Sequence, residues 1–368
     1  MKIAIFHQFL DNIGGAEILT LTLARRLKGD VYTTNISKNK IEKAGFRDII
    51  PRIKSIGKVP KRAPFKHQLA LYRFSKLKLG SKYDKYMISG DWAISGALHN
   101  KPCLWYCHSP CRELWDLKNY VKYELLPFWK RPFFECWVFF NRRLHKHYIS
   151  QIQKIVCNSK NTQKRLKKYL NIEAEVIYPP INTSKYLFKK SKGYWLSVNR
   201  LLGHKRVELQ ISAFQKMPNK KLVIVGSYEK GANQFEEYKT KIEKMLPVNV
   251  KLKHWVSDKY LIKLYSECEG FVVTSKDEDF GMTPVEAMAS GKPVVAVNEG
   301  GFKESVTEKT GKLVKADPKE IMNAINDISD ELKITPEKYR NECIKQAKKF
   351  DEDIFIRKIK NELDTLKK

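Results

Sequence analysis

The sequence predicts an α/β protein with two doubly wound lobes, and three observations favour that class. The chain has 368 residues, a length that suits two domains of ordinary size. It opens with a short apolar segment, a glycine-containing loop and a segment of helical periodicity. The same succession restarts near residue 195, so a second lobe of the same kind follows the first.

The first lobe begins with a buried strand at residues 2–6, which are apolar after the initial lysine. The loop that follows contains Gly14 and Gly15, and glycine lets the backbone approach a ligand closely. A helix is expected next, because apolar residues recur at intervals of three and four, namely Ala16, Leu19, Leu23 and Leu27. Strand, glycine loop and helix form the opening of a doubly wound sheet.

The second lobe repeats this order over a longer stretch. We predict strands at residues 195–198, 222–225, 271–274 and 294–297, and helices at residues 207–214 and 284–290. A proline-containing, basic segment with the composition of a linker precedes the first of these strands. We therefore place the boundary near residue 187, which gives lobes of residues 1–187 and 188–368.

The tail of the chain reads as charged helices. Thr335 is expected to cap a helix whose first residue is Pro336. The spacing of four residues predicts one buried face, made by Tyr339, Cys343, Ala347 and Phe350. Two placements stay open: the last helix caps the second lobe, or it crosses back to the first.

Positive charge is unevenly distributed along the chain. Lysine and arginine number 70 against 40 aspartate and glutamate, a formal net charge of +30. Residues 1–200 carry +26 of this charge and residues 201–368 carry +4. A basic lobe favours a polyanionic partner, namely nucleic acid, an anionic membrane surface or a phosphorylated ligand. No nucleic-acid-binding motif is recognisable, so that first class rests on charge alone.

The seven cysteines argue against a disulfide framework. Their number is odd and we find no signal-peptide pattern, so we expect free thiols in the reducing cytoplasm. Cys103, Cys107 and Cys111 recur every four residues beside His108, but this spacing fits no common zinc site. We therefore expect structural thiols and no metal at this cluster.

Two segments combine aromatic, apolar and basic side chains without being long enough to cross a membrane. No apolar run reaches the roughly 18 residues that span a bilayer. Residues 64–79 and 125–140 carry the mixture. Two interpretations remain open: these segments lie in a membrane interface, or they are core helices with basic outer faces.

Residues 271–301 carry the strongest chemical signal. An acidic loop follows a predicted strand and leads into a predicted helix, which is where α/β sheets bind ligands. Glu278 in the loop and Glu286 in the helix are placed to flank one polyhydroxyl ligand. There is an alternative for Glu286, because Thr283, Pro284 and Glu286 also match a capping box that only closes the helix.

Residues 278–294 resemble the Glu-x7-Glu signature of the family-four retaining glycosyltransferases, which have the two-lobed GT-B fold. The resemblance continues in the family's order over nearly the whole chain, at residues 14–17, 106–110, 157–159, 177–180, 199–205 and 298–301. Among family members, the chain most resembles the mannosyltransferases that extend lipopolysaccharide O-antigen or other lipid-linked glycans. The fold that this implies is two Rossmann-like lobes facing a central cleft.

The resemblance implies a role for each matching residue. Glu286 is expected to hold the ribose hydroxyls of a sugar nucleotide, and Glu278 the hydroxyls of the transferred sugar. Arg200 and Lys205 match the basic pair on the diphosphate, where they offset the charge that grows on the leaving group. His108 matches the histidine that lies against the reacting sugar. The remaining donor-binding positions are Gly14, Gly15, Phe280, Gly281, Met282 and Thr283.

The resemblance also implies an activity and its partners. We expect a retaining transfer of a hexose, mannose from GDP-mannose, onto a lipid-linked or cell-surface glycan. No tightly bound cofactor and no obligatory metal are expected. The basic first lobe would bind the acceptor and face an anionic membrane, and the second lobe would bind the donor. The enzyme would be cytoplasmic and peripheral on the inner face of the cell membrane, with no nucleic-acid partner.

Three alternatives to this activity remain open. The same fold would also suit a UDP-sugar donor or a sugar-nucleotide epimerase, and a basic nucleic-acid-binding protein is the non-enzyme alternative. One departure from the family bears on the nucleotide: residues 254–257 read His-Trp-Val-Ser where relatives usually have a glycine. Trp255 there would either stack on a base or fill core.

Overall fold

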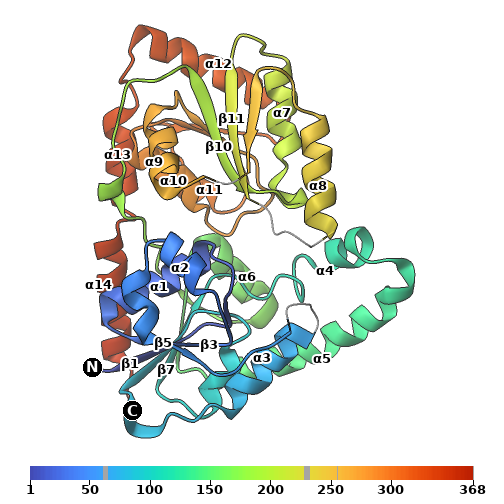
Figure 1. Ribbon diagram of the computed structural model, residues 1–368, viewed down its shortest axis with the longest axis vertical. Coiled ribbons are helices and arrows are strands. Elements are labelled where there is room, and N and C mark those ends of the chain that lie inside the picture. Colours follow the sequence, from blue (N-terminus) through green and yellow to red (C-terminus); the bar gives the residue numbers. More distant parts are fainter. Residues whose placement is uncertain (61–64, 228–232, 255, 368) are drawn as a thin grey trace. The chain divides into compact units, whose positions relative to one another are not determined.

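In the computed structural model, residues 1–60, 65–227, 233–254 and 256–367 are described, and the chain divides into two compact units (Figure 1). Unit 1 comprises Met1–Tyr178 and Phe355–Lys368, and unit 2 comprises Pro179–Ile354. The expected boundary near residue 187 therefore falls inside unit 2. The physical reason is packing, because Ile177 lies in the core of unit 1 whereas Ile181 pairs with Asp351 of unit 2.

Unit 1 is built on a parallel sheet with the strand order β5-β3-β1-β6-β7-β8-β9. The order runs one way from β1 to β5 and the other way from β6 to β9, so the sheet reverses between β1 and β6. The strands are β1 (Ile3–Phe6), β3 (Asp30–Thr33), β5 (Ile53–Ser55), β6 (Lys85–Ile88), β7 (Cys103–Cys107), β8 (Lys154–Cys157) and β9 (Glu175–Val176). A separate pair joins β2 (Phe9–Leu10) to β4 (Asn35–Ile36).

Helices cover both faces of this sheet, because successive strand residues point to opposite sides. Ile3 and Ile5 of β1 pack with α1 and α14, whereas Ala4 and Phe6 pack on the side of α3, α5 and α6. The helices are α1 (Gly15–Leu27), α2 (Lys38–Lys43), α3 (Phe65–Lys76), α4 (Lys118–Tyr120), α5 (Arg131–Ile149), α6 (Lys160–Leu170) and α14 (Glu352–Thr365).

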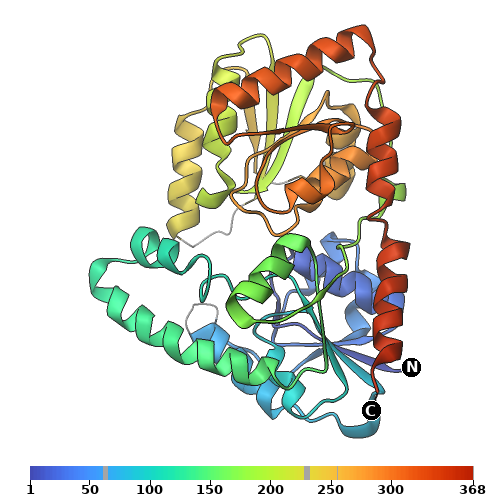
Figure 2. The ribbon, with the colours of Figure 1, turned by 180° about the vertical axis from the view of Figure 1, so that it is seen from behind.

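The last helix belongs to the core of unit 1, so of the two placements left open the chain adopts the return to the first lobe. Phe355, Ile356, Ile359 and Leu363 of α14 are buried in the same apolar cluster as Leu19 and Leu23 of α1. Figures 1 and 2 show α14 on the α1 side of the unit 1 sheet. The amphipathic spacing of this helix fits any apolar surface, which is why the sequence left both placements open.

Unit 2 is built on a second parallel sheet, with the order β12-β11-β10-β13-β14-β15. This sheet reverses between β10 and β13. Its strands are β10 (Tyr194–Arg200), β11 (Lys221–Ser227), β12 (Val250–Lys253), β13 (Phe271–Val273), β14 (Val294–Val297) and β15 (Gly311–Val314). Its helices are α7 (Val207–Gln215), α8 (Asn233–Lys244), α9 (Asp258–Glu267), α10 (Met282–Ala289), α11 (Phe302–Ser305), α12 (Pro318–Ile334) and α13 (Arg340–Lys348).

Most predicted elements of unit 2 are confirmed, and the α/β class with two parallel sheets is confirmed with them. The predicted helix start at Thr335 is wrong. Thr335 ends α12, which runs to Ile334 because Ile321, Ile325 and Ile328 give it one continuous buried face, and the next helix begins at Arg340. The predicted buried face further on is confirmed, since Tyr339, Cys343, Ala347 and Phe350 are all buried.

Candidate functional site

The loops at the reversal of the unit 2 sheet hold one cluster of candidate site residues. Ligands of doubly wound sheets bind outside the carboxyl ends of the strands where the order reverses, which here are β10 and β13. Lys205 lies in the loop after β10 and Glu278 in the loop after β13. Their side chains form an ion pair, with 2.5 Å between Lys205 Nζ and Glu278 Oε2. The sheet therefore brings together two of the predicted site residues.

Backbone hydrogen bonds tie the two loops to each other beneath this pair. The amide of Lys276 donates to the carbonyl of His204 at 2.7 Å. The Thr274 hydroxyl lies 3.0 Å and 2.9 Å from the carbonyl oxygens of Lys205 and Arg206. The position of Lys205 is thus set by the exit of the neighbouring strand and not by its own loop alone.

The Glu278 carboxylate is held in its charged form. Burial by itself would raise the pKa of this carboxyl group. The Lys205 ammonium outweighs that effect and lowers the pKa to about 2. An opposite charge in direct contact favours ionisation in this way. Glu278 can therefore accept hydrogen bonds from hydroxyl groups across the whole neutral range.

The loop after β14 packs backbone against backbone below Glu278. The Gly301 amide donates to the Glu278 carbonyl at 2.8 Å. Gly300 has a φ of 54°, and a Cβ at that position would lie 2.4 Å from the Glu278 carbonyl oxygen. Only glycine adopts this conformation at such close approach without strain. The glycine pair thus lets the loop after β14 pack directly against the backbone of the acidic loop and hold it in place.

Glu286 lies inside α10, and the alternative capping-box interpretation is wrong. Helix α10 begins at Met282 with Gly281 as its N-cap, and no side chain caps it. Glu286 Oε2 instead accepts the Tyr265 hydroxyl at 2.7 Å, and Tyr186 also hydrogen-bonds this carboxyl. Burial raises the pKa of Glu286, and the two tyrosine hydrogen bonds counteract that rise. The Glu286 carboxyl group is thus half-buried and oriented by the tyrosines, and it does not cap the helix.

The other predicted donor-binding residues of unit 2 differ in what they offer a ligand. The Phe280 ring is 2% exposed and contacts the Phe350 ring at 5.2 Å between centroids, so Phe280 can present only its backbone. Met282 and Thr283 open α10 and are partly exposed, next to Gly281 with its φ of 84°. Arg200 is the exposed last residue of β10. Trp255 lies outside the described residues.

Sequence reasoning missed Arg206 as a residue that shapes this site. Its guanidinium donates two hydrogen bonds to the Glu299 carboxylate, at 3.1 Å and 2.9 Å, and a third to the Thr274 carbonyl at 2.8 Å. The loops after β10, β13 and β14 are thereby joined by one side chain. Two features of the sequence could have pointed to Arg206: it is adjacent to Lys205, and its partner Glu299 lies in the motif at residues 298–301.

The reversal of the unit 1 sheet carries a second polar cluster, and His108 belongs to it. His7 and Ser89 directly follow β1 and β6, the two strands at the reversal. Ser89 Oγ lies 3.0 Å from His108 Nε2 and 2.8 Å from Thr20 Oγ1, which in turn lies 3.1 Å from His7 Nδ1. Sequence reasoning found His108 but missed His7, Thr20 and Ser89. The ends of the two strands were the signal that could have found two of them.

Glu17 connects this cluster to the predicted glycine pair. Its Oε2 accepts the Gly14 amide at 2.8 Å and its Oε1 lies 3.3 Å from His7 Nε2. Burial raises the pKa of Glu17, but the hydrogen bond and charge of His7 lower it to about 2. The Gly14 amide is thus engaged within the chain, whereas Gly15 is exposed at the first turn of α1.

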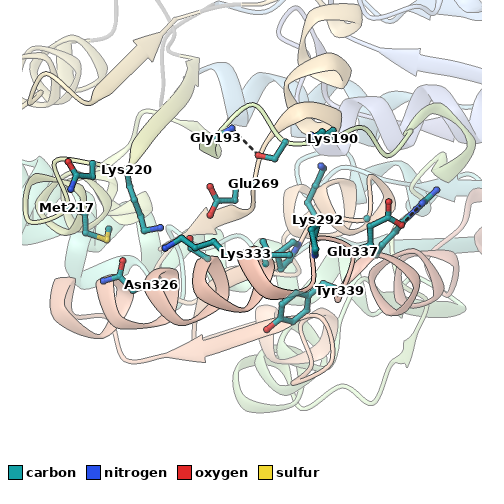
Figure 3. Close-up of a pocket in the computed structure, with 18 of the residues that line it drawn as sticks. Lys190, Gly193, Met217, Lys220, Glu269, Lys292, Asn326, Lys333, Glu337 and Tyr339 are labelled. Carbon is teal, nitrogen blue, oxygen red and sulfur yellow. Dashed lines mark hydrogen bonds and ion pairs between the residues drawn. The ribbon is translucent and has the colours of Figure 1, made fainter.

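A pocket of about 990 Å³ in unit 2 lies near the amino ends of the strands, and not at the carboxyl ends that carry Lys205 and Glu278 (Figure 3). Its lining includes residues that directly precede strands, among them Gly193 before β10 and Lys220 before β11. Several lysines point into this region, including Lys292 and Lys333. Because doubly wound sheets bind their principal ligand at the carboxyl ends of the strands, we do not place the active site here.

Helix α5 presents an apolar face to solvent. Phe133, Cys136, Phe140 and Leu144 recur at intervals of three and four and are all exposed, Phe133 by 75%. The preceding residues Phe128 and Trp129 are exposed as well. Both views show α5 extending away from the unit 1 sheet (Figures 1 and 2). Of the two interpretations left open, a fully core position for these aromatics is therefore excluded. No helix among the described residues is long and apolar enough to cross a membrane.

Basic side chains accompany these aromatics. The Arg143 guanidinium lies 4.3 Å from the centre of the Phe139 ring, and Lys130 Nζ lies 4.7 Å from the Trp129 ring. On α3, Phe65 and Tyr72 are exposed too, whereas Phe74 of the same helix is buried. We call the exposed apolar and basic residues of α3, residues 128–130 and α5 the aromatic–basic surface.

Two family matches together run almost from end to end of the chain. Residues 13–185 match Glycosyltransferase Family 4, and residues 180–350 match Glycosyl transferases group 1. The Alpha-1,3/1,6-mannosyltransferase ALG2 of Candida glabrata is 28% identical over 93% of this chain and 87% of its own length. The O-antigen chain mannosyltransferase RfbU of Salmonella typhimurium is 30% identical over 56% of this chain and 59% of its own length.

Solved structures share the fold over the whole chain. The Anabaena protein Alr3699/HepE, in complex with UDP and glucose, matches with a TM-score of 0.77 and 20% identity over 100% of both chains. The sucrose-phosphate synthase of Thermosynechococcus elongatus matches with a TM-score of 0.74 and 18% identity, over 98% of this chain and 97% of that one. At these identities the likeness establishes the fold alone.

Proposed function

The chain belongs to the glycosyltransferases of GT-B fold that join a family 4 domain to a group 1 domain, and we propose that it transfers mannose from GDP-mannose to a lipid-linked glycan with retention of configuration. Its relatives include enzymes named as mannosyltransferases from Candida glabrata and Salmonella typhimurium. Unit 2 is the donor-binding domain in this proposal, and unit 1 binds the acceptor.

The Lys205–Glu278 ion pair at the sheet reversal carries the proposal. An ammonium and an ionised carboxylate in direct contact offer adjacent sites of opposite charge. A sugar nucleotide needs that arrangement, because its diphosphate is anionic and its sugar carries hydroxyl donors. Glu286, held by Tyr265, supplies a second carboxylate for the ribose hydroxyls.

Catalysis in this proposal comes from positioning and charge. As the bond between the sugar and the diphosphate breaks, negative charge grows on the leaving phosphate, and Lys205 and Arg200 stabilise it. The loops that carry these residues are tied together by Arg206, so little reorganisation is needed during the reaction. His108 contacts the reacting sugar, and the departing phosphate takes the proton of the acceptor hydroxyl.

The aromatic–basic surface supports a lipid-linked acceptor at an anionic membrane. Aromatic side chains favour the level of the lipid headgroups, and each lysine or arginine near an anionic surface adds about 1 kcal/mol of attraction. Exposed aromatics of α5 and the residues before it lie directly beside Lys130 and Arg143. We propose that this surface docks unit 1 on the cytoplasmic face of the membrane, where the seven thiols would stay reduced.

A transfer assay with purified chain tests the proposed reaction. GDP-mannose, UDP-glucose and UDP-galactose are each supplied with and without a mannose-terminated lipid-linked acceptor, and nucleoside diphosphate release is measured. We expect release only from GDP-mannose and only with acceptor, and an α-linked product by NMR. Release without acceptor, or interconversion of the sugar, would show hydrolysis or epimerisation and overturn the proposal. Release from a UDP-sugar alone would refute the GDP-mannose assignment.

A further inference from the structure

Four hydrogen-bonding contacts link Glu17 to His108 through the interior of unit 1. They run from Glu17 Oε1 to His7 Nε2 (3.3 Å), from His7 Nδ1 to Thr20 Oγ1 (3.1 Å), from Thr20 Oγ1 to Ser89 Oγ (2.8 Å) and from Ser89 Oγ to His108 Nε2 (3.0 Å). A fifth contact branches from Thr20 Oγ1 to the Ala16 carbonyl (2.8 Å). The side chains of His7, Thr20 and Ser89 are fully buried. Two buried polar atoms in contact destabilise the folded state unless one of them donates a proton to the other.

Counting protons assigns the donors from Thr20 to His108. The Ala16 carbonyl can only accept, so the single Thr20 hydroxyl proton must go to it. Thr20 Oγ1 is then the acceptor for Ser89 Oγ, which must donate. The Ser89 proton is thereby used, and His108 Nε2 must donate to Ser89.

His7 links Glu17 to the rest of this chain of contacts. Its Nε2 lies 3.3 Å from Glu17 Oε1, and its Nδ1 lies 3.1 Å from Thr20 Oγ1. The Gly14 amide holds the Glu17 carboxyl group in place through Oε2 at 2.8 Å. The ionisable groups in contact along this chain are Glu17, His7 and His108.

We propose that His7, held by Glu17, is a positioning residue that acts through Thr20 and Ser89 to hold His108 as the neutral tautomer protonated on Nε2. His108 Nδ1 then serves as a hydrogen-bond acceptor for a hydroxyl group of the reacting sugar, and His108 is not a proton donor in the reaction. This inference rests on the proposed function for its substrate, whereas the proton arrangement stands on the geometry of unit 1 alone.

The electrostatics agree with this assignment. Burial lowers the pKa of His108 to about 3, although the Glu17 charge and a hydrogen bond to the Ser89 backbone oppose this fall, so the ring stays neutral at neutral pH. A neutral imidazole has one donor and one acceptor nitrogen, and the hydrogen bond made by one nitrogen decides the role of the other. The buried serine hydroxyl therefore determines what His108 offers to a substrate.

Nitrogen-15 NMR of histidine-labelled protein tests the proton arrangement without requiring activity. The chain has eight histidines, and single His7→Asn and His108→Asn variants assign the two signals of interest. We expect His108 to show a proton on Nε2 only, and this signal to change in His7→Asn, which removes the positioning contact. A His108 signal with its proton on Nδ1, or one that is the same in His7→Asn, would overturn the inference.

Ser89→Ala connects the arrangement to catalysis. Ser89→Ala removes the side-chain acceptor of His108 Nε2 and leaves only the backbone of residue 89, so we expect a weaker preference for the Nε2-protonated tautomer and a roughly tenfold fall in kcat/KM. The Kd of GDP should not change, because the nucleotide is assigned to unit 2. Ser95→Ala is the matched control, since Ser95 is equally buried but donates to the Leu71 carbonyl outside this cluster.

The outcomes separate this inference from the proposed function. If the tautomers are as expected but no sugar nucleotide supports transfer, the proposed function fails and the proton arrangement stands. If transfer occurs and Ser89→Ala alters neither the His108 spectrum nor kcat/KM relative to Ser95→Ala, the inference fails and the proposed function stands.

Discussion

Lys205 Nζ and Glu278 Oε2 lie 2.5 Å apart although 73 positions separate the two residues in the sequence. The pair lies where the strand order of the unit 2 sheet reverses, because Lys205 follows β10 and Glu278 follows the adjacent strand β13. A cation and an anion are thus presented side by side at the edge where doubly wound sheets bind ligands. The following predictions test what each part of this site and of unit 1 contributes.

Removal of the Lys205 cation should weaken donor binding strongly. In Lys205→Ala, the diphosphate loses its partner and the Glu278 carboxylate is left without its counter-ion, so we expect GDP-mannose affinity to fall at least 30-fold, about 2 kcal/mol. Isothermal titration calorimetry measures this change. Lys312→Ala is the control, because Lys312 forms a similar 2.6 Å ion pair with Asp327 away from the site. Equal affinity in both variants would contradict the assignment of Lys205.

The ion pair should also make stability depend on pH. The pKa of Glu278 is lowered from 4.5 to about 2 in the folded chain, so its stabilising contribution is present above pH 4.5 and is lost as pH falls toward 2. The difference in unfolding free energy between wild type and Glu278→Gln is therefore expected to narrow by about 2 kcal/mol between pH 6 and pH 3. Urea titrations at each pH give this difference. A gap independent of pH would show that the pair contributes no charge interaction.

Tyr265 should set the lower pH limit of donor binding. Burial raises the pKa of Glu286, and the Tyr265 hydroxyl, 2.7 Å from Oε2, opposes that rise. In Tyr265→Phe the pKa of Glu286 rises further, so the carboxylate becomes protonated at a higher pH and the loss of GDP affinity begins there. Across a pH series we expect the affinity of the variant for GDP to start falling at a higher pH than that of wild type, with a difference of about fivefold where the two curves lie furthest apart, the value of one hydrogen bond. Tyr194→Phe is the control, because its hydroxyl donates to the Leu264 carbonyl. An unchanged pH profile would count against Glu286 as the ribose ligand.

Arg206 should be irreplaceable by lysine. Its guanidinium makes two hydrogen bonds to Glu299 and one to the Thr274 carbonyl, a geometry that an ammonium cannot reproduce. We expect Arg206→Lys to lower unfolding free energy by about 1–2 kcal/mol and to raise the KM for the donor, because the three loops are no longer joined. Arg25→Lys, at the exposed fork with Asp48, should cost less than about 1 kcal/mol. If the unfolding free energy falls by a similar amount in both variants, Arg206 does not have the proposed role of joining the loops of the site.

The aromatic–basic surface should control membrane association. Phe133 and Phe140 are exposed on one face of α5, and replacing both by serine removes their insertion into the headgroup region. We expect co-sedimentation with anionic liposomes to fall at least tenfold at low salt, while turnover of a detergent-dispersed acceptor is retained. Val248→Ser in unit 2 is the control, because Val248 is fully exposed there. Binding that survives the double substitution would place the membrane contact elsewhere.

The strands and the principal motif were predictable because their signals are local. Short apolar runs bounded by turns mark β10, β13 and β14, and the spacing of Glu278 and Glu286 is visible in one continuous segment. The start of α10 was misjudged by two residues, since Gly281 and not Thr283 caps the helix. A glycine N-cap carries no side-chain oxygen, so the sequence pattern pointed to the residue that has one.

The sequence by itself determined that the chain has two α/β lobes, that the basic charge is concentrated in the first, and which carboxylates match the family motif. Only the tertiary structure decided that α14 packs in unit 1, that Arg206 joins three loops, and that His7, Ser89 and His108 meet. The reason is physical. Periodicity reports which face of an element is buried but not against what, whereas the order of strands in a parallel sheet decides which distant loop residues share one edge.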